Sequence, residues 1–184
     1  MRKKSSLQST EVNVEMRRQA LKGLGALGLA GVLPLSALAQ SKAINVGVIL
    51  PLSGANAQFG INSKQGVELV ADEINASGGL KGLGGAKINL VIADSTSTPN
   101  NAATVAQRLI AENECCAILG AFASSLTLAI SEVTERRGVP LITMSYSDQL
   151  TGRGFKNVFQ VTPKGSVIGK AQFNFASELS GGTS

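Results

Sequence analysis

Serine hydroxyls are the groups in this sequence with the clearest capacity to bind a ligand. Ser124 and Ser125 stand where a periodic apolar stretch begins, and Ser145 and Ser147 directly follow an apolar run. A helix N-terminus offers unpaired N–H groups and roughly half a positive charge, so a carboxylate can bind there with serine hydroxyls as additional donors. The alternative is that one of these serines only caps its own helix.

Other residue types exclude several classes of chemistry. The sequence contains no histidine, so a His-based triad, a His-ligated metal and an imidazole pH switch are all excluded. The two cysteines, Cys115 and Cys116, are neighbours, and neighbouring strand residues point to opposite faces, which disfavours a shared metal or an ordinary bridge. We expect two small, buried apolar residues in a strand; an intermolecular bridge or a redox role is the alternative. We expect no metal and no cofactor.

The elements that must position these side chains follow from apolar periodicity after residue 40. Short apolar runs predict strands at 43–50, 87–93, 115–119 and 139–144. Apolar residues at i, i+3, i+4 and i+7 predict helices over 61–76, from Pro99 onward and over 124–137. Thr98 supplies a capping hydroxyl before the second helix, and Gly138 ends the third. Strands that are apolar on both faces and alternate with helices predict an α/β fold, a parallel sheet flanked by helices.

Four loops follow the carboxyl ends of these strands, where ligands bind in sheets of this kind. Only two acids, Asp94 and Asp148, lie in them; the loops are 51–60, 94–99, 120–125 and 145–150. After residue 40 the sequence has neither a G-x-S-x-G elbow nor a G-K-[ST] phosphate loop. These observations favour a binding protein over an enzyme.

Positive charge is concentrated near the N-terminus. The formal net charge is +5, but residues 1–39 contain six of the 17 Lys and Arg and two of the 12 acids, which leaves 11 basic and 10 acidic residues. The rest of the chain thus has a net charge of only +1, with one tyrosine and no tryptophan. It lacks the basic stripe and stacking aromatic residues that nucleic acids require, so we expect no nucleic-acid partner.

Residues 1–39 have the layout of a removable export signal. Basic residues within 17–22 precede an uncharged, mostly apolar stretch over 23–33, and an A-x-A cleavage site ends at Ala39. A bilayer span needs roughly 20 apolar residues, so we expect cleavage after Ala39, release into the periplasm and no stable membrane anchor. The segment 17–22 resembles the twin-arginine export signal, although Ala20 replaces the usual bulky apolar residue. Ordinary secretion is the alternative.

Several short motifs occur in a fixed order along the chain. They are P-L-S-G at 51–54, F-G at 59–60, E-I-N-x-x-G-G at 73–79, a glycine at 120 followed by Ser124-Ser125, and G-V-P at 138–140. In this order they resemble the N-terminal lobe of the type I periplasmic substrate-binding proteins that serve branched-chain amino acid ABC transporters. The resemblance implies an exported receptor that binds an amino acid or similar small polar ligand between two lobes and delivers it to an ABC permease in the inner membrane.

The resemblance also implies roles for particular residues. Ser124 corresponds to a ligand for the amino acid's carboxylate, and Ser147 to a ligand for both carboxylate and ammonium. Ser145 corresponds to a residue whose backbone carbonyl faces the ammonium, and Phe59 to an aromatic residue near the ligand side chain. Ser125 is a further donor or only the helix cap. Tyr146 is larger than the usual residue beside the ligand, and it either narrows the pocket or points away.

The resemblance divides the chain into three parts. Residues 1–39 are the signal peptide, 40–160 the N-terminal lobe, and 161–184 the start of the crossover to the second lobe. Across the boundary between the last two parts, a strand at 158–162 precedes a helix from Ser166 that has Ile168, Ala171, Phe175 and Leu179 on one face. The second lobe, with its acidic partner for the ammonium, is missing, so we expect a truncated chain with half a site. The alternatives are a ligand-sensing domain of the same fold and a non-functional fragment.

Overall fold

The computed structural model describes residues 43–181, so the expected leader and its cleavage after Ala39 lie outside the described residues. Its strands are β1 (Ile44–Leu50), β2 (Ile88–Asp94), β3 (Ala117–Gly120), β4 (Leu141–Thr143) and β5 (Val158–Gln160). Its helices are α2 (Ala57–Ala76), the 3-10 helix η2 (Lys81–Leu83), α3 (Pro99–Ala111), α4 (Ser124–Arg137), α5 (Gln149–Gly152) and α6 (Gly165–Leu179).

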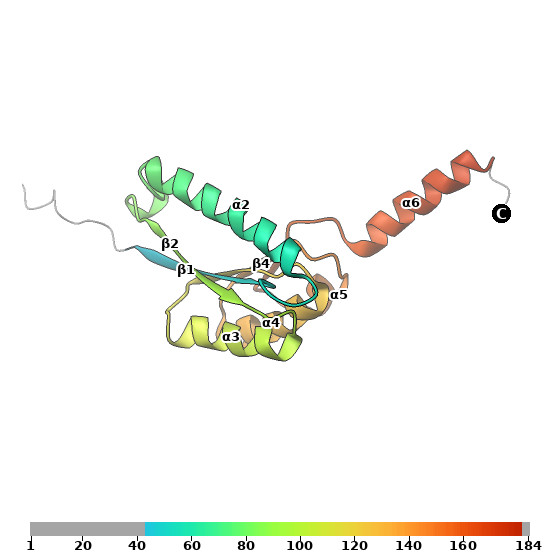
Figure 1. Ribbon diagram of the computed structural model, residues 1–184. Helices are drawn as coiled ribbons and strands as arrows, with labels where there is room; N and C mark the ends of the chain where they lie inside the picture. Colours follow the sequence, from blue (N-terminus) through green and yellow to red (C-terminus); the bar gives the residue numbers. More distant parts are fainter. Residues whose placement is uncertain (1–42, 182–184) are drawn as a thin grey trace, which may run out of the picture. The chain divides into compact units, whose positions relative to one another are not determined.

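All the strand pairs of the sheet are parallel, which confirms the predicted fold class. The sheet has five strands in the order β2-β1-β3-β4-β5. Helix α2 lies on one face, and α3 and α4 lie on the other (Figure 1). Parallel strands place all their carboxyl ends at one edge of the sheet. The loops after β1, β2, β3 and β4 therefore begin at this carboxyl edge.

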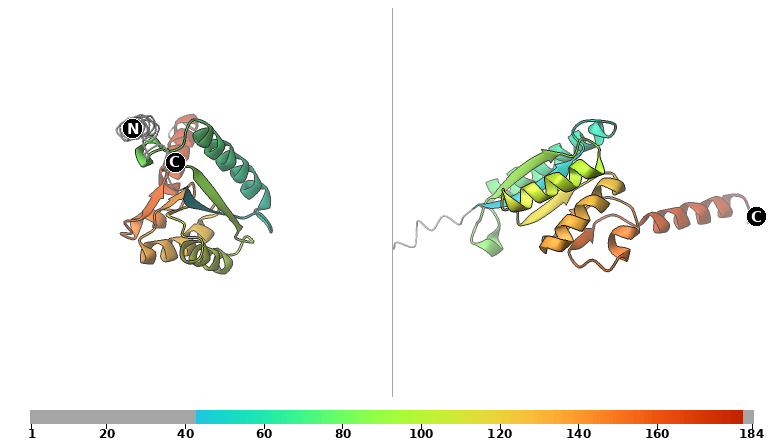
Figure 2. Two further views of the ribbon diagram at one scale, coloured as in Figure 1. Left: turned by 90° about the vertical axis from the view of Figure 1, so that its left-hand side faces the viewer. Right: turned by 90° about the horizontal axis from the view of Figure 1, so that it is seen from below.

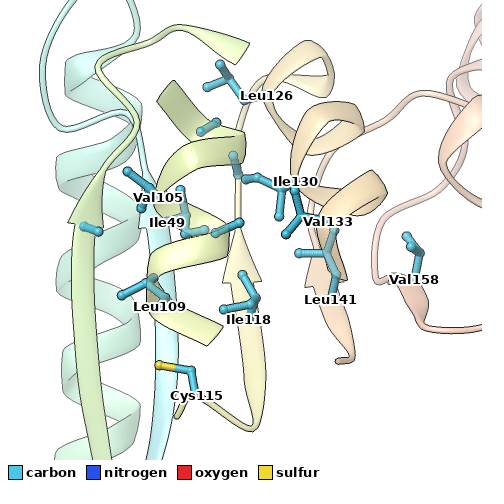
Figure 3. Packing of buried hydrophobic residues seen from close by; sticks show 14 of the residues in the cluster. Ile49, Val105, Leu109, Cys115, Ile118, Leu126, Ile130, Val133, Leu141 and Val158 are labelled. Carbon is cyan, nitrogen blue, oxygen red and sulfur yellow. The ribbon is translucent and has the colours of Figure 1, made fainter. Parts of the chain in front are cut away.

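The main core lies between the sheet and the helices α3 and α4. Ile49 of β1 and Ile118 of β3 are fully buried there against Leu109, Leu126 and Ile130 (Figure 3). Burial of each such side chain contributes about 1.5–3 kcal/mol to folding. The i, i+4 spacing of Leu126 and Ile130 places both on the sheet-facing side of α4, as their periodicity predicts.

Helix α4 agrees with its predicted bounds, but α2 begins earlier than predicted. It starts at Ala57 because the carbonyl of Asn56 already accepts hydrogen bonds from the N–H groups of Phe59 and Gly60, at 3.1 and 3.3 Å. Gly60 lies directly against the backbone carbonyl of Pro51, and a Cβ at this position would collide with it. The F-G motif therefore belongs to the first turn of α2, where glycine permits close approach to the end of β1.

Two further expectations differ from the structure. The hydroxyl of Thr98 does not cap α3; it lies 3.3 Å from that of Thr96 and 3.5 Å from the carbonyl of Ser95, because the turn before α3 offers it these nearer partners. Both cysteines precede β3, and only Cys115 is buried, whereas Cys116 is exposed. Burial, and then the neighbouring thiol, raise the pKa of Cys115.

No helix within residues 43–181 has the length and apolar character needed to cross a membrane.

Candidate ligand-binding site

The loops after β3 and β4 bring two of the expected ligand-binding residues together at the carboxyl edge. The Oγ of Ser124, in the first turn of α4, accepts a hydrogen bond from the backbone N–H of Ser147 at 3.2 Å. The Oγ of Ser147 accepts one from the N–H of Gln149 at 3.3 Å. Both hydroxyls thus act as acceptors toward the protein, and each retains its own hydrogen for donation to a ligand oxygen.

The N-terminus of α4 has no side-chain cap. The N-cap residue is Ala123, and the first intrahelical bonds run from the N–H groups of Leu126 and Thr127 to its carbonyl, both at 3.1 Å. The N–H groups of Ser124 and Ser125 precede these donors and lie outside the helix's own hydrogen bonds. Ser125 is exposed and does not cap the helix. The helix start therefore offers N–H donors beside the Ser124 hydroxyl.

Ser145 is held inside the protein, and the ligand-contacting role that the resemblance implies for it stays a prediction. It is fully buried, and its backbone carbonyl already accepts hydrogen bonds from Gln160 Nε2 at 2.7 Å and Thr162 Oγ1 at 2.9 Å. A carbonyl oxygen has two lone pairs, and groups of this chain already use both of them. The Ser145 hydroxyl instead donates to the carbonyls of Ala121 and Phe122, at 2.7 and 3.0 Å. Ser145 fixes the loop that leads into α4.

An aromatic pair lies next to these loops. The ring of Phe59, in α2, stacks on the ring of Phe122, with centroids 4.1 Å apart and planes inclined by 5°. Phe59 is 52% exposed, so one side of the pair faces solvent. The residue roles expected from the sequence did not include Phe122. Its position in the sequence could have indicated a role, because Phe122 is the one aromatic residue in the 120–125 loop.

Tyr146 lies between the buried Ser145 and the half-buried Ser147. Its side chain is 46% exposed and is not part of the core. Its backbone carbonyl accepts a hydrogen bond from the N–H of Gly165, at 2.7 Å, where α6 begins. Tyr146 thus connects the loop after β4 to the start of α6, and its predicted place beside a ligand stays a prediction.

The acids of the four loops are held by hydrogen bonds. Asp94 accepts bonds from the hydroxyl of Ser53 at 2.5 Å and from the N–H groups of Leu52 and Thr96 at 2.8 and 2.7 Å. Burial alone would raise the pKa of Asp94, but these donors together lower it. The hydroxyl and N–H of Ser166 lower the pKa of Asp148. Hydrogen bonds thus hold Asp94 against the loop after β1 and Asp148 against the first turn of α6, and both carboxylates are weak proton acceptors.

No cluster of three or more His, Cys, Asp or Glu side chains suited to a metal ion occurs within residues 43–181. The chemistry offered at the carboxyl edge is therefore that of neutral donors, a helix N-terminus and an aromatic surface. Such a set is chemically suited to an anionic group beside an apolar one.

A parallel α/β lobe with hydroxyls and N–H donors at its carboxyl edge defines a ligand-binding class of protein. Residues 43–184 match the model of a family described as periplasmic binding protein, and the chain belongs to this family. It is 39% identical over 141 residues to an amino acid binding protein of Pseudomonas aeruginosa, and 38% identical over 143 residues to Leu/Ile/Val-binding protein homolog 7 of Brucella suis.

A solved structure shows the same fold. It is the branched-chain amino acid transporter substrate binding protein LivJ from Streptococcus pneumoniae in complex with isoleucine, with 33% identity and a TM-score of 0.63. The match covers 67% of this chain and 34% of that protein. The two curated relatives are matched over 76% and 77% of this chain, but over only 37% and 35% of their own lengths. This chain therefore spans little more than a third of those relatives.

Proposed function

We propose that this chain is the N-terminal lobe of an exported solute-binding component of an ABC importer. Its ligand is an amino acid of branched-chain type or a similar small polar molecule, and it catalyses no reaction. The observation that carries this proposal is the pairing of Ser124 and Ser147 at the uncapped N-terminus of α4. Hydrogen-bond donors converge there, as a ligand carboxylate requires.

The carboxylate would bind at the start of α4. The N–H groups of Ser124 and Ser125 supply two donors, and the hydroxyls of Ser124 and Ser147 supply two more. The partial positive charge of the helix end favours a negative group at this position. Hydrogen bonds to a charged group contribute about 1.5–3 kcal/mol each.

The rest of the ligand would face two different surfaces. The Phe59 and Phe122 rings supply an apolar wall for an aliphatic side chain. The ammonium group would need an acceptor, and Asp94 and Asp148, the two acids of the carboxyl-edge loops within residues 43–181, already accept hydrogen bonds from the chain itself. Its acidic partner would belong to the second lobe that the family resemblance implies. This lobe alone would therefore bind weakly, and closure of two lobes would trap the ligand.

Transport follows from the same assignment. We place the receptor in the periplasm after removal of residues 1–39, by the twin-arginine route, where it would deliver its ligand to an inner-membrane permease. The family match supports the exported location. The two hydrogen-bonded aspartates support the absence of catalysis, since neither is poised as a general base near neutral pH.

Titration calorimetry of the purified chain with L-leucine tests the site. Replacing Ser124 or Ser147 by alanine should weaken binding by about 1.5–3 kcal/mol, which is roughly 10- to 150-fold. Leucinol, which lacks the carboxylate, should bind no more tightly to wild type than to either variant. Ser77→Ala, at the opposite end of α2, is the matched control and should leave affinity unchanged. Equal leucine affinity in wild type, Ser124→Ala and Ser147→Ala would refute the assignment.

A further inference from the structure

The residues on either side of Ser147 bond to a different helix from Ser147 itself. Ser147 donates its backbone N–H to the Oγ of Ser124, in the first turn of α4, at 3.2 Å. The preceding carbonyl, that of Tyr146, accepts the N–H of Gly165, the first residue of α6, at 2.7 Å. The following residue, Asp148, also bonds to α6, which extends away from the sheet (Figure 2). The loop after β4 is thus held between the starts of α4 and α6.

The carboxylate of Asp148 makes two bonds to α6, both with Ser166. Its Oδ1 accepts the backbone N–H of Ser166 at 3.0 Å, and its other oxygen accepts the Ser166 hydroxyl. The hydroxyl first, and then the N–H, lower the pKa of Asp148, so the carboxylate is charged at neutral pH. Hydrogen bonds to an ionised acceptor are roughly twice as strong as those between neutral groups. Asp148 is therefore firmly joined to the first turn of α6.

The hydroxyl of Ser147, and not the carboxylate of Asp148, accepts an N–H group at the start of α5. Asp148 has helical backbone angles, with φ of −60° and ψ of −28°, and its side chain does not cap α5. The Ser147 Oγ accepts the N–H of Gln149 at 3.3 Å, and the Ser147 carbonyl accepts that of Leu150 at 3.2 Å. Aspartate is a preferred capping residue, so a carboxylate released from Ser166 would compete for these N–H groups.

We propose that Asp148 is a positioning residue of the ligand-binding edge. Its bonds to Ser166 hold the neighbouring Ser147 hydroxyl where it donates to the ligand carboxylate. This role rests on the proposed function, since it concerns the same carboxylate site. Asp148 itself makes no bond to the ligand, because both of its oxygens are directed to Ser166.

Charge and geometry at Asp148 act on ligand binding in opposite directions. A negative charge next to Ser147 disfavours a bound carboxylate, so removal of the charge alone should strengthen binding slightly. Loss of the bonds to Ser166 should instead weaken binding. Asp148→Asn removes the charge but can keep both bonds, because an amide oxygen accepts the Ser166 N–H and an amide nitrogen donates to its hydroxyl. Asp148→Ala removes the charge and both bonds, so the two variants separate the two effects.

Titration calorimetry with L-leucine is the first test of this role. We expect Asp148→Asn to bind leucine at least as tightly as wild type, and Asp148→Ala to bind it about 3- to 10-fold more weakly, as is usual for coupled neighbours. In a Ser147→Ala chain, Asp148→Ala should cause no further loss, because the hydroxyl that it positions is absent. A residue that only stabilises the fold would not produce this non-additivity.

Glu135→Ala is the matched control. Glu135 also holds a loop with its carboxylate, which accepts the N–H groups of Lys156 and Asn157, both at 2.9 Å. It lies in the last turn of α4, at the opposite end of that helix from Ser124. Its loss removes bonds of the same kind far from the carboxyl edge, so leucine affinity should equal that of wild type.

Amide hydrogen exchange of the unliganded chain, measured by NMR, tests the same role without a ligand. Asp148→Ala should speed exchange of the Ser147 N–H about 3- to 10-fold, because the loop then opens more often. Asp148→Asn and Glu135→Ala should leave that rate unchanged.

The two measurements separate this role from the proposed function. A wild-type chain that binds no leucine would count against the proposed function, and the exchange rate would still decide the role of Asp148. Unchanged Ser147 exchange in Asp148→Ala would overturn the positioning role. Equal weakening of leucine binding by Asp148→Ala and Asp148→Asn would also overturn it, because the charge would then act on the ligand directly. In a chain that binds leucine, wild-type affinity in Asp148→Ala would do the same.

Discussion

Phe59 and Phe122 stack face to face, although 63 positions separate them in the sequence and they belong to opposite sides of the site. One belongs to the first turn of α2 and the other to the loop before α4. The Phe122 carbonyl is in turn held by the Ser145 hydroxyl at 3.0 Å. The stack therefore joins the β1 side of the carboxyl edge to the β4 side.

Loss of this stack should be measurable in stability. We expect Phe122→Ala to lower the free energy of unfolding by at least about 1 kcal/mol, because a stacked pair contributes about 0.5–1.5 kcal/mol beyond its buried area. Urea unfolding followed by circular dichroism measures the change. Phe173→Ala, which removes an exposed ring from α6, should cost less than about 0.5 kcal/mol. Equal losses in both variants would show that the stack contributes nothing.

Two glycines of α2 should respond to alanine in opposite directions. Gly60→Ala drives a methyl group into the carbonyl of Pro51 and should destabilise the protein by about 1–3 kcal/mol. Gly66→Ala adds a methyl group to open space on the same helix and should stabilise it by about 0.5–1 kcal/mol through lower backbone entropy. Thermal unfolding of both variants checks this pair, and a shift of the same sign in both would contradict it.

Asp94 should make stability depend on pH under acidic conditions. Its pKa is lower in the folded protein than in the unfolded chain, so its contribution is present above the ordinary aspartate pKa of about 3.9 and is lost as the pH falls through the folded value. Asp94→Asn should cost about 2 kcal/mol at pH 7 through lost charged hydrogen bonds, and its cost should shrink below about pH 4. Urea midpoints from pH 7 to pH 3 measure this trend. Asp72→Asn, on the exposed side of α2, is the control, and a cost independent of pH at Asp94 would argue against the charged bonds.

Ser145 should act on stability and not on ligand chemistry. Ser145→Ala removes the donor to the Phe122 carbonyl inside the protein and should lower the free energy of unfolding by about 1–3 kcal/mol. Calorimetric titration at a temperature where the variant remains folded should show leucine affinity close to that of wild type. A stable variant that has lost leucine binding would instead return Ser145 to the ligand-contacting role that the family resemblance implies.

The export route can be tested in cells. Replacing Arg17 and Arg18 by lysine should retain the precursor in the cytoplasm if the twin-arginine pathway carries it, because that pathway reads the arginine pair itself. Immunoblots of periplasmic and cytoplasmic fractions report the outcome. The matched variant Arg2→Lys changes a basic residue outside the pair and should be exported normally. Unchanged export of the double variant would show that the precursor uses the ordinary secretion pathway instead.

Periodicity was sufficient to predict the order and type of the five strands and of the helices α2, α3, α4 and α6, but it did not predict the short helices η2 and α5. Helix α4 was predicted at its observed bounds because its apolar spacing is regular and Gly138 ends it in the left-handed conformation, with φ of +66°. The start of α2 was missed because Phe59 and Gly60 lie in a motif that reads as a loop. The fit of Gly60 against Pro51 is a tertiary contact that no local pattern encodes.

The site was predicted less completely than the fold. Parallel topology brings the loops after β3 and β4 together, so the proximity of Ser124 and Ser147 could be expected. The burial of Ser145 and the two bonds to its carbonyl could not, because they depend on Gln160 and Thr162, which lie in β5 and just after it. The stack on Phe122 likewise depends on how α2 packs, which sequence spacing does not specify.

Because the two cysteines differ in exposure, a thiol reagent should modify one of them and leave the other unmodified. Cys115 is buried and its pKa is raised, whereas its neighbour Cys116 is exposed at the amino end of β3. Thiolates and not thiols attack maleimides, so a fluorophore should attach at Cys116. This attachment point lies at the opposite end of the sheet from Ser124 and Ser147, and a label there would report on the lobe without occupying its ligand-binding edge.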